Sequence, residues 1–207
     1  MRRSDSALLA LGAAAVASQG HDIYRPRDGA LPQNSLEMLS ELQHRPYSDA
    51  DRPSLERLLH DYLALTAEEL EKAPWHFALP INAVVSMTFD KLEMFTPPNG
   101  QILIATIDGE AHGTASVKMI RPAAAELKRM YVTGEARGRG IGESLVSSSV
   151  DIALKLGATE MYLDTPPPFK SAHRLYQRQG FIWTEEYPEV DIPDELKIDW
   201  LYMHKQL

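Results

Sequence analysis

The sequence predicts a mixed α/β (α+β) fold in which helices flank one central sheet, and three observations support this prediction. Three segments rich in branched residues follow one another with short turns between them, which is typical of an antiparallel meander. A glycine-rich turn then leads into an amphipathic helix, and a further strand follows that helix. Because such a strand–helix–strand crossover sets its two strands parallel, the sheet is expected to be mixed and mostly antiparallel.

The chain is expected to divide at about residue 40. Residues 1–40 open with the apolar run "ALLALGAAAVA" and continue with a proline- and glycine-containing stretch typical of a linker. This extension is predicted to be helical, disordered or a presequence. A presequence over residues 1–20 is the alternative because two arginines precede the apolar run and "AVA" resembles a cleavage site. Residues 41–207 then form a single domain, in keeping with the length of the chain.

The predicted domain begins with a short extended piece before Pro46, followed by an amphipathic helix capped by Asp51 or Ser54. Its apolar positions recur at helical spacing, at Leu55, Leu58, Leu59, Tyr62 and Leu63. The segment "TAEE" at 66–69 has the form of a capping box, so a second short helix is expected to start there. Residues 74–100 show no clear pattern until the turn signal "PPNG" at their end.

Three strands are expected next. "QILIATI" over 101–107 is rich in branched residues, and Asp108 with Gly109 supplies a tight hairpin turn. The strand over 110–120 therefore returns antiparallel, and a third strand is predicted over 126–132. Together these segments make the meander.

The second half of the domain alternates helices and strands. A helix over 141–156 has one apolar stripe and ends before a glycine. The strand over 159–165 is predicted to lie parallel to the third strand of the meander. A triple proline then precedes a short helix over 171–179, and strands over 181–185 and 200–207 complete the sheet. An acidic loop joins these last two strands.

Composition excludes several classes of function. The net charge of -8 argues against nonspecific nucleic-acid binding, which needs a basic surface. No stretch of about 18 uncharged apolar residues is available to span a bilayer. The chain has no cysteine, which excludes disulfides, thiolate metal sites and cysteine nucleophiles. We expect a cytoplasmic protein without a metal, with an organelle or secretory presequence in residues 1–20 as the alternative; the lack of cysteine does not by itself identify the compartment.

The segment "ARGRGIG" between the third strand and the following helix points to a phosphate-bearing ligand. Its glycines at 138, 140 and 142 allow a close approach to the backbone, and the positive end of the helix dipole lies at the same point. Arg137 and Arg139 add positive charge. The spacing fits neither a Walker loop, which needs a lysine, nor the dinucleotide fingerprint G-x-G-x-x-G. The alternative is a glycine turn that merely connects a strand to a helix.

Two segments resemble a known family. "ELKRMYVTGEARGRGIG" resembles the central motif of the GNAT superfamily of N-acetyltransferases, and "SAHRLYQRQGF" resembles its second signature. The resemblance covers about residues 41–207. It implies a GNAT-like central sheet with splayed strands that form the acetyl-CoA groove. One departure is Phe169, which stands where the family often has an asparagine and affects the contacts around the pantetheine and thiol end.

The resemblance also implies which residues bind acetyl-CoA. They are the main-chain groups of Met130, Tyr131 and Val132 and the loop and helix residues Arg137, Gly138, Arg139, Gly140, Ile141, Gly142 and Ser144. Tyr176 is expected to protonate the departing sulfur, with an aromatic that merely packs the helix as the alternative. Glu126 is expected to take a proton from the amine directly or through water, with a surface ion pair to Lys128 or Arg121 as the alternative. His173 is a rival acid or base.

The predicted function is therefore that of an acetyl-CoA-dependent N-acetyltransferase. It would acetylate a primary amine of a small molecule, an amino acid or a peptide by direct attack in a ternary complex. The acidic run over 185–195 is either an anionic wall that attracts a cationic amine or a solvated loop. The alternative function is a noncatalytic acyl-CoA-binding module. The expected partners are acetyl-CoA and the amine, with no nucleic acid and no membrane, and a homodimer is left open.

Overall fold

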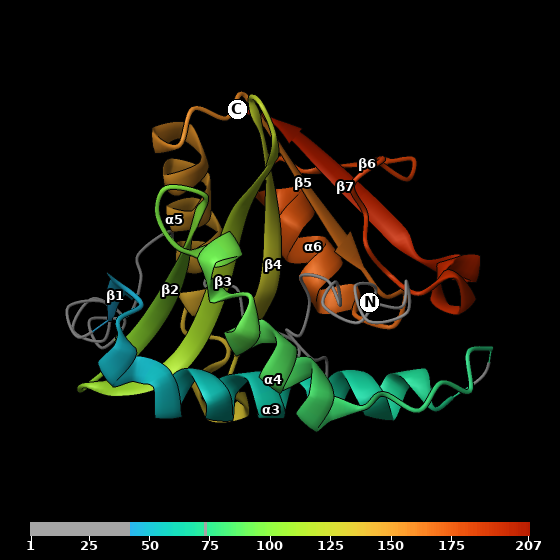
Figure 1. The fold of residues 1–207 in the computed structure, drawn as a ribbon, viewed down its shortest axis with the longest axis horizontal. Helices are drawn as coiled ribbons and strands as arrows, with labels where there is room; N and C mark the ends of the chain where they lie inside the picture. The colour runs from blue at the N-terminus through green and yellow to red at the C-terminus, as the bar shows by residue number, and fades with distance from the viewer. Residues whose placement is uncertain (1–41, 73) are drawn as a thin grey trace, which may run out of the picture.

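A computed structural model describes residues 42–72 and 74–207, so the expected extension over 1–40 lies outside the described residues. The fold is a seven-stranded mixed sheet with helices on both faces, as predicted (Figure 1). The strands are β1 Gln43–Pro46, β2 Gly100–Ile107, β3 Glu110–Arg121, β4 Ala124–Val132, β5 Glu160–Thr165, β6 Ile182–Thr184 and β7 Leu201–Gln206. The α-helices are α3 Arg52–Leu70, α4 Ile81–Asp90, α5 Ile141–Lys155 and α6 Lys170–Arg178.

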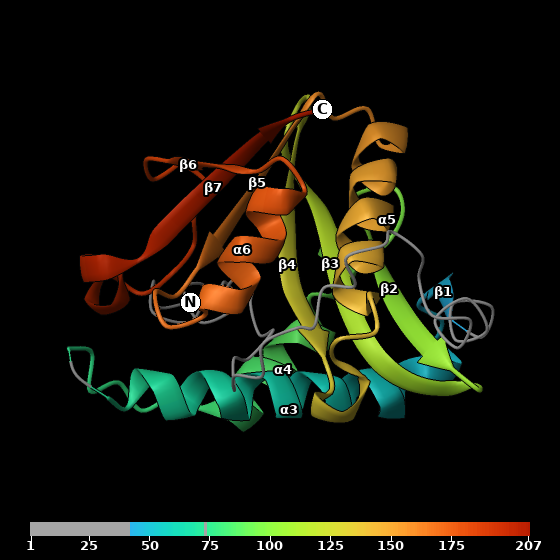
Figure 2. The ribbon, with the colours of Figure 1, turned by 180° about the vertical axis from the view of Figure 1, so that it is seen from behind.

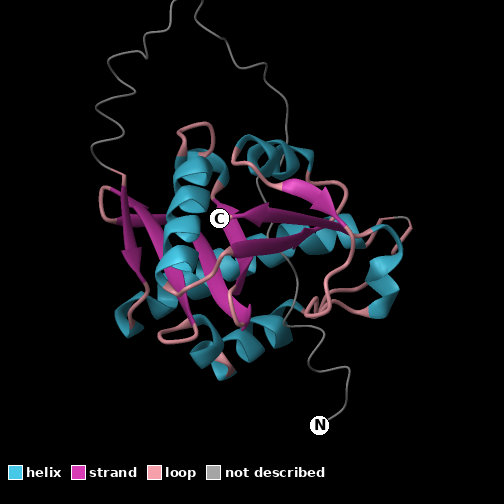
Figure 3. Cartoon of the chain, turned by 90° about the horizontal axis from the view of Figure 1, so that it is seen from above, coloured by secondary structure: helices cyan, strands magenta, loops and turns pink. Residues whose placement is uncertain are grey.

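The sheet has the strand order β1-β2-β3-β4-β5-β7-β6. Helices α3 and α4 lie against one face, whereas α5 and α6 lie against the other (Figure 2). A view from above shows the strands passing between helices on the two sides (Figure 3). Every strand pair is antiparallel except β4 with β5, which confirms the predicted crossover.

The helix after β1 is longer than the sequence indicated. Helix α3 runs without a break through Leu70, so the prediction of a second helix starting at 66–69 is wrong. Thr66 is buried inside α3, and its hydroxyl donates to the Tyr62 carbonyl at 2.9 Å. A threonine hydroxyl can bond the carbonyl one turn earlier as readily as it can cap a helix. The unassigned stretch after α3 contains α4, whose Val84, Val85 and Thr88 are buried.

The meander forms as predicted. Asp108 and Gly109 both have a positive φ, at 52° and 80°, as a two-residue hairpin turn between twisted strands requires. The β3–β4 register shifts between Thr114 and Ser116, which marks a β-bulge. Arg129 lies opposite this shift on β4 and has a φ of 51°, which is unusual for a residue with a long side chain.

Strands β4 and β5 pair over only three residues each. The parallel register joins Ala124 to Glu160 and ends where Glu126 meets Tyr162. Beyond this point β5 continues to pair with β7 as far as Thr165. The two strands therefore diverge, which confirms the predicted splay (Figure 1). The edge of β4 that faces β5 has no strand partner after Glu126 among the described residues.

Within the described part of the chain, no helix is long and apolar enough to cross a membrane. The same part contains no group of three or more histidine and carboxylate side chains arranged to hold a metal ion.

Candidate active site

The glycine-rich loop joins the end of β4 to the start of α5. Gly138 and Gly140 have φ values of 75° and 79°, a left-handed conformation that favours glycine. Gly140 is the N-cap of α5, and Ser144 donates its backbone N–H to the Gly140 carbonyl at 3.0 Å. Gly142 lies inside the first turn of α5. Two of the three alternating glycines therefore shape the turn, and the third lies in the first turn of the helix.

The backbone N–H groups of residues 138–143 are the main chemical feature of this loop. Among residues 42–72 and 74–207, no backbone carbonyl accepts a hydrogen bond from any of them. Free N–H groups at the start of a helix point toward the positive end of its dipole and bind anions. The predicted anion site thus coincides with a loop whose N–H groups do not donate to backbone carbonyls of the described residues.

Three arginines surround this loop. Arg137 donates its Nε to the Val132 carbonyl at 3.1 Å, so its side chain is turned back onto β4. Arg139 is exposed on the loop itself. Arg178 comes from α6, and its Nη2 lies 2.7 Å from Oε1 of Glu143 in the first turn of α5. Sequence reasoning did not include Arg178, because its approach to α5 depends on how the two helices pack.

Tyr176 is fully buried on α6 and faces β4 where β4 and β5 diverge. Its hydroxyl donates to the sulfur of Met130 at 3.4 Å. Burial raises the pKa of this phenol well above its ordinary value, and Tyr62 and Asp164 raise it further. Tyr176 therefore carries its proton at neutral pH, which is the state that a general acid needs.

His173 lies on the same helix as Tyr176. Its Nε2 is 3.1 Å from the Pro166 carbonyl, and its ring packs edge-on against Trp183. Because a carbonyl only accepts hydrogen bonds, Nε2 is the nitrogen that carries the proton. Burial lowers the pKa of His173 to about 4, so the ring is neutral at pH 7. These contacts tie α6 to the triple-proline loop and to β6.

Glu126 is fully buried rather than part of a surface ion pair. Its carboxylate lies 2.9 Å from Lys118 Nζ and 3.1 Å from Lys128 Nζ, and it accepts a hydrogen bond from the Tyr187 hydroxyl. Of the two partners expected for such a pair, Lys128 is present, whereas Arg121 binds other carboxylates. Burial raises the pKa of Glu126, but Lys128 and Lys118 outweigh that effect and lower it.

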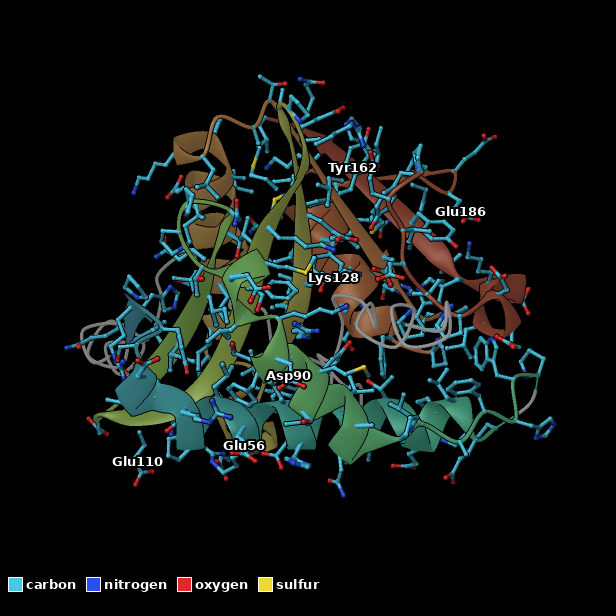
Figure 4. All side chains as sticks on the ribbon, viewed as in Figure 1. Glu56, Asp90, Glu110, Lys128, Tyr162 and Glu186 are labelled. Carbon is cyan, nitrogen blue, oxygen red and sulfur yellow. The ribbon has the colours of Figure 1, made fainter. Side chains whose placement is uncertain are left out.

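Glu126 belongs to a larger buried ion cluster. We define this cluster by six side chains, Lys118, Glu126, Lys128, Asp164, Tyr187 and Trp200. Lys128 Nζ lies 2.9 Å from Asp164, and the Trp200 indole N–H donates to the same carboxylate at 2.8 Å. Burial raises the pKa of Asp164, although Lys128 opposes it. Lys128 lies near the middle of the molecule between β4 and β5, whereas Glu56 and Glu110 point outward (Figure 4).

The loop between β6 and β7 covers the buried ion cluster. The Tyr187 ring packs against Tyr162 of β5 at a tilt of 40°, with ring centroids 4.8 Å apart. Two acids of the predicted anionic wall are already paired, Glu186 with Lys197 at 2.6 Å and Glu189 with Arg121 at 2.6 Å. The Glu189–Arg121 pair holds the loop against β3, whereas the Glu186–Lys197 pair lies within the loop itself.

Arg129 is a further buried cation on the α3 side of the β-bulge. Its guanidinium lies 4.5 Å from the ring centre of Phe95, in the short helix η3 Leu92–Phe95. Burial lowers the pKa of Arg129 to about 10. Its position next to Met130 places a positive charge beside the bulged part of β4.

Comparisons with known proteins agree with this geometry. Residues 64–181 match the acetyltransferase (GNAT) family. An uncharacterised N-acetyltransferase of Schizosaccharomyces pombe is 33% identical over 138 residues, which cover 66% of this chain and 83% of that protein. A crystal structure of an acetyltransferase from Streptococcus agalactiae superposes with a TM-score of 0.64 at 22% identity, covering 81% of this chain and 99% of that one. The PaiA N-acetyltransferase of Thermoplasma acidophilum, in complex with coenzyme A, gives a TM-score of 0.62 at 18% identity, with 80% and 99% covered.

Proposed function

The chain belongs to the GNAT family of acetyltransferases, and from this premise we propose that it acetylates a primary amine of a small molecule, an amino acid or a peptide. The observation that carries the proposal is the set of N–H groups at residues 138–143, which meet no backbone carbonyl in the described residues. They lie at the end of the strand that separates from β5. A diphosphate at the loop would let the acyl arm of acetyl-CoA enter between the two strands.

We propose that the diphosphate binds the loop residues Arg137 to Gly142 together with Ser144. Backbone N–H groups and guanidinium groups both bind phosphate oxygens well. Met130, Tyr131 and Val132 then offer main-chain groups to the pantetheine and to the acyl oxygen. Their strand has no partner on the β5 side beyond Glu126 in the described chain, which supports this role. Hydrogen bonds to the acyl oxygen stabilise the charge that develops on it during transfer.

Tyr176 is the proposed acid that protonates the departing thiolate. Its hydroxyl is next to Met130 on β4, within reach of a thioester held along that strand. Because its pKa is raised, the phenol is protonated at neutral pH and has a proton to offer to the sulfur as the C–S bond of the thioester breaks.

Glu126 is the proposed base, acting on the amine directly or through water. Two ammonium groups hold its pKa low, so it is ionised but weakly basic. We therefore expect Glu126→Gln to lower turnover modestly, by about tenfold, and to alter the pH profile of the rate. Turnover that stays at the wild-type value across the pH range would remove Glu126 from the mechanism.

The domain division is part of the proposal. Residues 41–207 are expected to contain every group that the reaction needs, since the loop, Tyr176 and Glu126 all lie there. In the described residues, helices already cover both faces of the seven-stranded sheet. A chain that starts at residue 41 should therefore keep the acetyl-transfer activity of the whole protein in the same assay.

The decisive experiment measures thiol release from acetyl-CoA over a panel of amines, amino acids and peptides. Calorimetry with CoA is run beside it. We expect CoA binding together with amine-dependent release for at least one class of acceptor. Binding without release across the whole panel would favour the noncatalytic acyl-CoA-binding module. No binding of CoA at all would overturn both functions.

A further inference from the structure

Helix α6 presents a row of positive charges on its exposed side. Lys170, Arg174 and Arg178 recur at every fourth position, so they follow one side of the helix, and all three are exposed. The residues of α6 include no acid. The opposite side is buried and carries Tyr176 and its neighbours. The row is a local exception in a chain whose net charge is -8.

One end of the row, at Arg178, lies beside the glycine-rich loop. Arg178 binds Glu143 across the gap between α6 and α5, with the two atoms 2.7 Å apart. The other oxygen of Glu143 lies 3.9 Å from the point that a Cβ on Gly140 would occupy. The guanidinium of Arg178 therefore lies near the N-cap of α5. Helices α5 and α6 share the same face of the sheet, so a ligand on the loop can meet both (Figure 2).

The rest of the row is available to an anion. In the described part of the chain, neither Lys170 nor Arg174 forms an ion pair with a carboxylate. Arg174 instead makes a long contact of 3.4 Å with the hydroxyl of Ser171. From Lys170 to Arg178 the row extends about 12 Å along the helix axis. A row of this length suits a second phosphate group some distance from the loop.

The ligand of the proposed function carries such a group. Coenzyme A has a diphosphate and, separated from it by the ribose, a 3′-phosphate monoester that is close to doubly ionised at neutral pH. The N–H groups of residues 138–143 suit the diphosphate, and Arg137 is already turned toward β4. Guanidinium groups bind a phosphate monoester through paired N–H donors.

Resting on the proposed function, we propose that Arg174 and Arg178 bind the 3′-phosphate of coenzyme A and that Lys170 adds long-range attraction. Glu143 holds the Arg178 guanidinium toward the loop and gives way to the phosphate when the ligand binds. The row thereby makes the protein select coenzyme A over the same molecule without its 3′-phosphate. This role is separate from holding the diphosphate, which both molecules carry.

The test compares two ligands that differ only in the 3′-phosphate, CoA and 3′-dephospho-CoA. Calorimetry on the full-length protein should give at least about tenfold tighter binding of CoA, because hydrogen bonds to charged groups are strong. The double variant Arg174→Gln/Arg178→Gln should lose about tenfold in affinity for CoA. Its affinity for 3′-dephospho-CoA should stay within about twofold of wild type, which also shows that it is folded. Lys155→Gln, which removes an exposed charge at the far end of α5, should change neither.

Each other outcome overturns the proposal. Equal wild-type affinity for the two ligands, or an equal loss for both in the double variant, would show that the row does not bind the 3′-phosphate. Those results would leave the proposed acetyl transfer intact, since thiol release is measured separately. If neither ligand binds, the proposed function fails together with this inference. The proposal also predicts a kinetic result, namely that the double variant raises the KM for acetyl-CoA and leaves kcat unchanged.

Discussion

Strand β4 joins two regions of opposite character. At its end after Val132, an exposed loop offers N–H groups that no backbone carbonyl accepts in the described residues, and its arginines lie at the surface or half-buried. At Glu126 and Lys128, the same strand carries fully buried charges with partners at 2.9 to 3.1 Å. The loop therefore has N–H groups available to a ligand. The buried charges of β4 are already paired within the protein.

The difference shows how the split sheet is held together. The main-chain ladder between β4 and β5 stops at Glu126. Two residues further along, Lys128 reaches Asp164 on β5, so a side-chain ion pair bridges the strands where backbone pairing has ended. Burying these charges costs desolvation free energy, which close pairing offsets. The buried ion cluster thus keeps β4 and β5 joined while leaving the main-chain edge of β4 unpaired.

The largest effect is expected from Tyr176→Phe, which tests whether the buried side of β4 takes part in the chemistry. Loss of the proposed acid should lower turnover by about 10²- to 10⁴-fold, with CoA affinity unchanged because the phenol is remote from the phosphates. Steady-state kinetics and calorimetry measure the two quantities. Tyr162→Phe is the control, since its hydroxyl donates to Glu160 at the start of β5. Turnover equal to wild type would leave Tyr176 as a packing residue.

The second effect concerns the stability of the buried ion cluster. Lys128→Met leaves Glu126 and Asp164 buried without their shared cation, so the free energy of unfolding should fall by about 3–5 kcal/mol. Urea denaturation followed by circular dichroism measures the loss. Lys72→Met removes an exposed lysine paired with Glu69 at 2.8 Å and should cost less than about 1 kcal/mol. Equal losses for the two variants would mean that the cluster does not hold the sheet.

The third effect is a pH dependence from His173. Its pKa in the folded protein is about 4, below its ordinary value of 6.5, so the unfolded chain takes up the proton first. Stability should therefore be full above pH 6.5 and fall as the pH drops toward 4, by at most about 3 kcal/mol. Urea midpoints across this range should show a weaker slope in His173→Gln. His60→Gln on α3 is the matched control, and an unchanged slope in His173→Gln would contradict the assignment.

The sequence predicted the loop better than the buried ion cluster for a physical reason. The turn at Gly138 and Gly140 depends on backbone conformation and on a helix that starts at once, and both are visible in a few consecutive residues. The cluster draws on four strands or loops, with Lys118 and Trp200 82 positions apart in the chain. Its only local signal is Glu126 and Lys128 at alternate positions of β4, a strand whose one other charged residue is Arg129. That signal identifies a polar face but not its partners.

Errors elsewhere have the same origin. The "TAEE" segment satisfied a capping pattern, yet tertiary packing kept α3 continuous and buried Thr66. Helix α4 starts after Pro80 without a side-chain cap, so no local signal marked its beginning. In both places the deciding factor was burial by tertiary packing, which a short window of sequence does not contain.

The smallest effect is expected from Arg139→Glu, which changes only the exposed glycine-rich loop. Reversing a charge beside the loop should weaken acetyl-CoA binding by about tenfold, because attraction to the diphosphate becomes repulsion. The free energy of unfolding should change by less than about 0.5 kcal/mol, since Arg139 is exposed. Calorimetry and urea denaturation together separate the two effects, and Lys155→Glu controls for net charge. Affinity that stays at the wild-type value would place the diphosphate elsewhere. A large loss of stability would mean that the loop, like the buried ion cluster, already uses its charges to hold the fold.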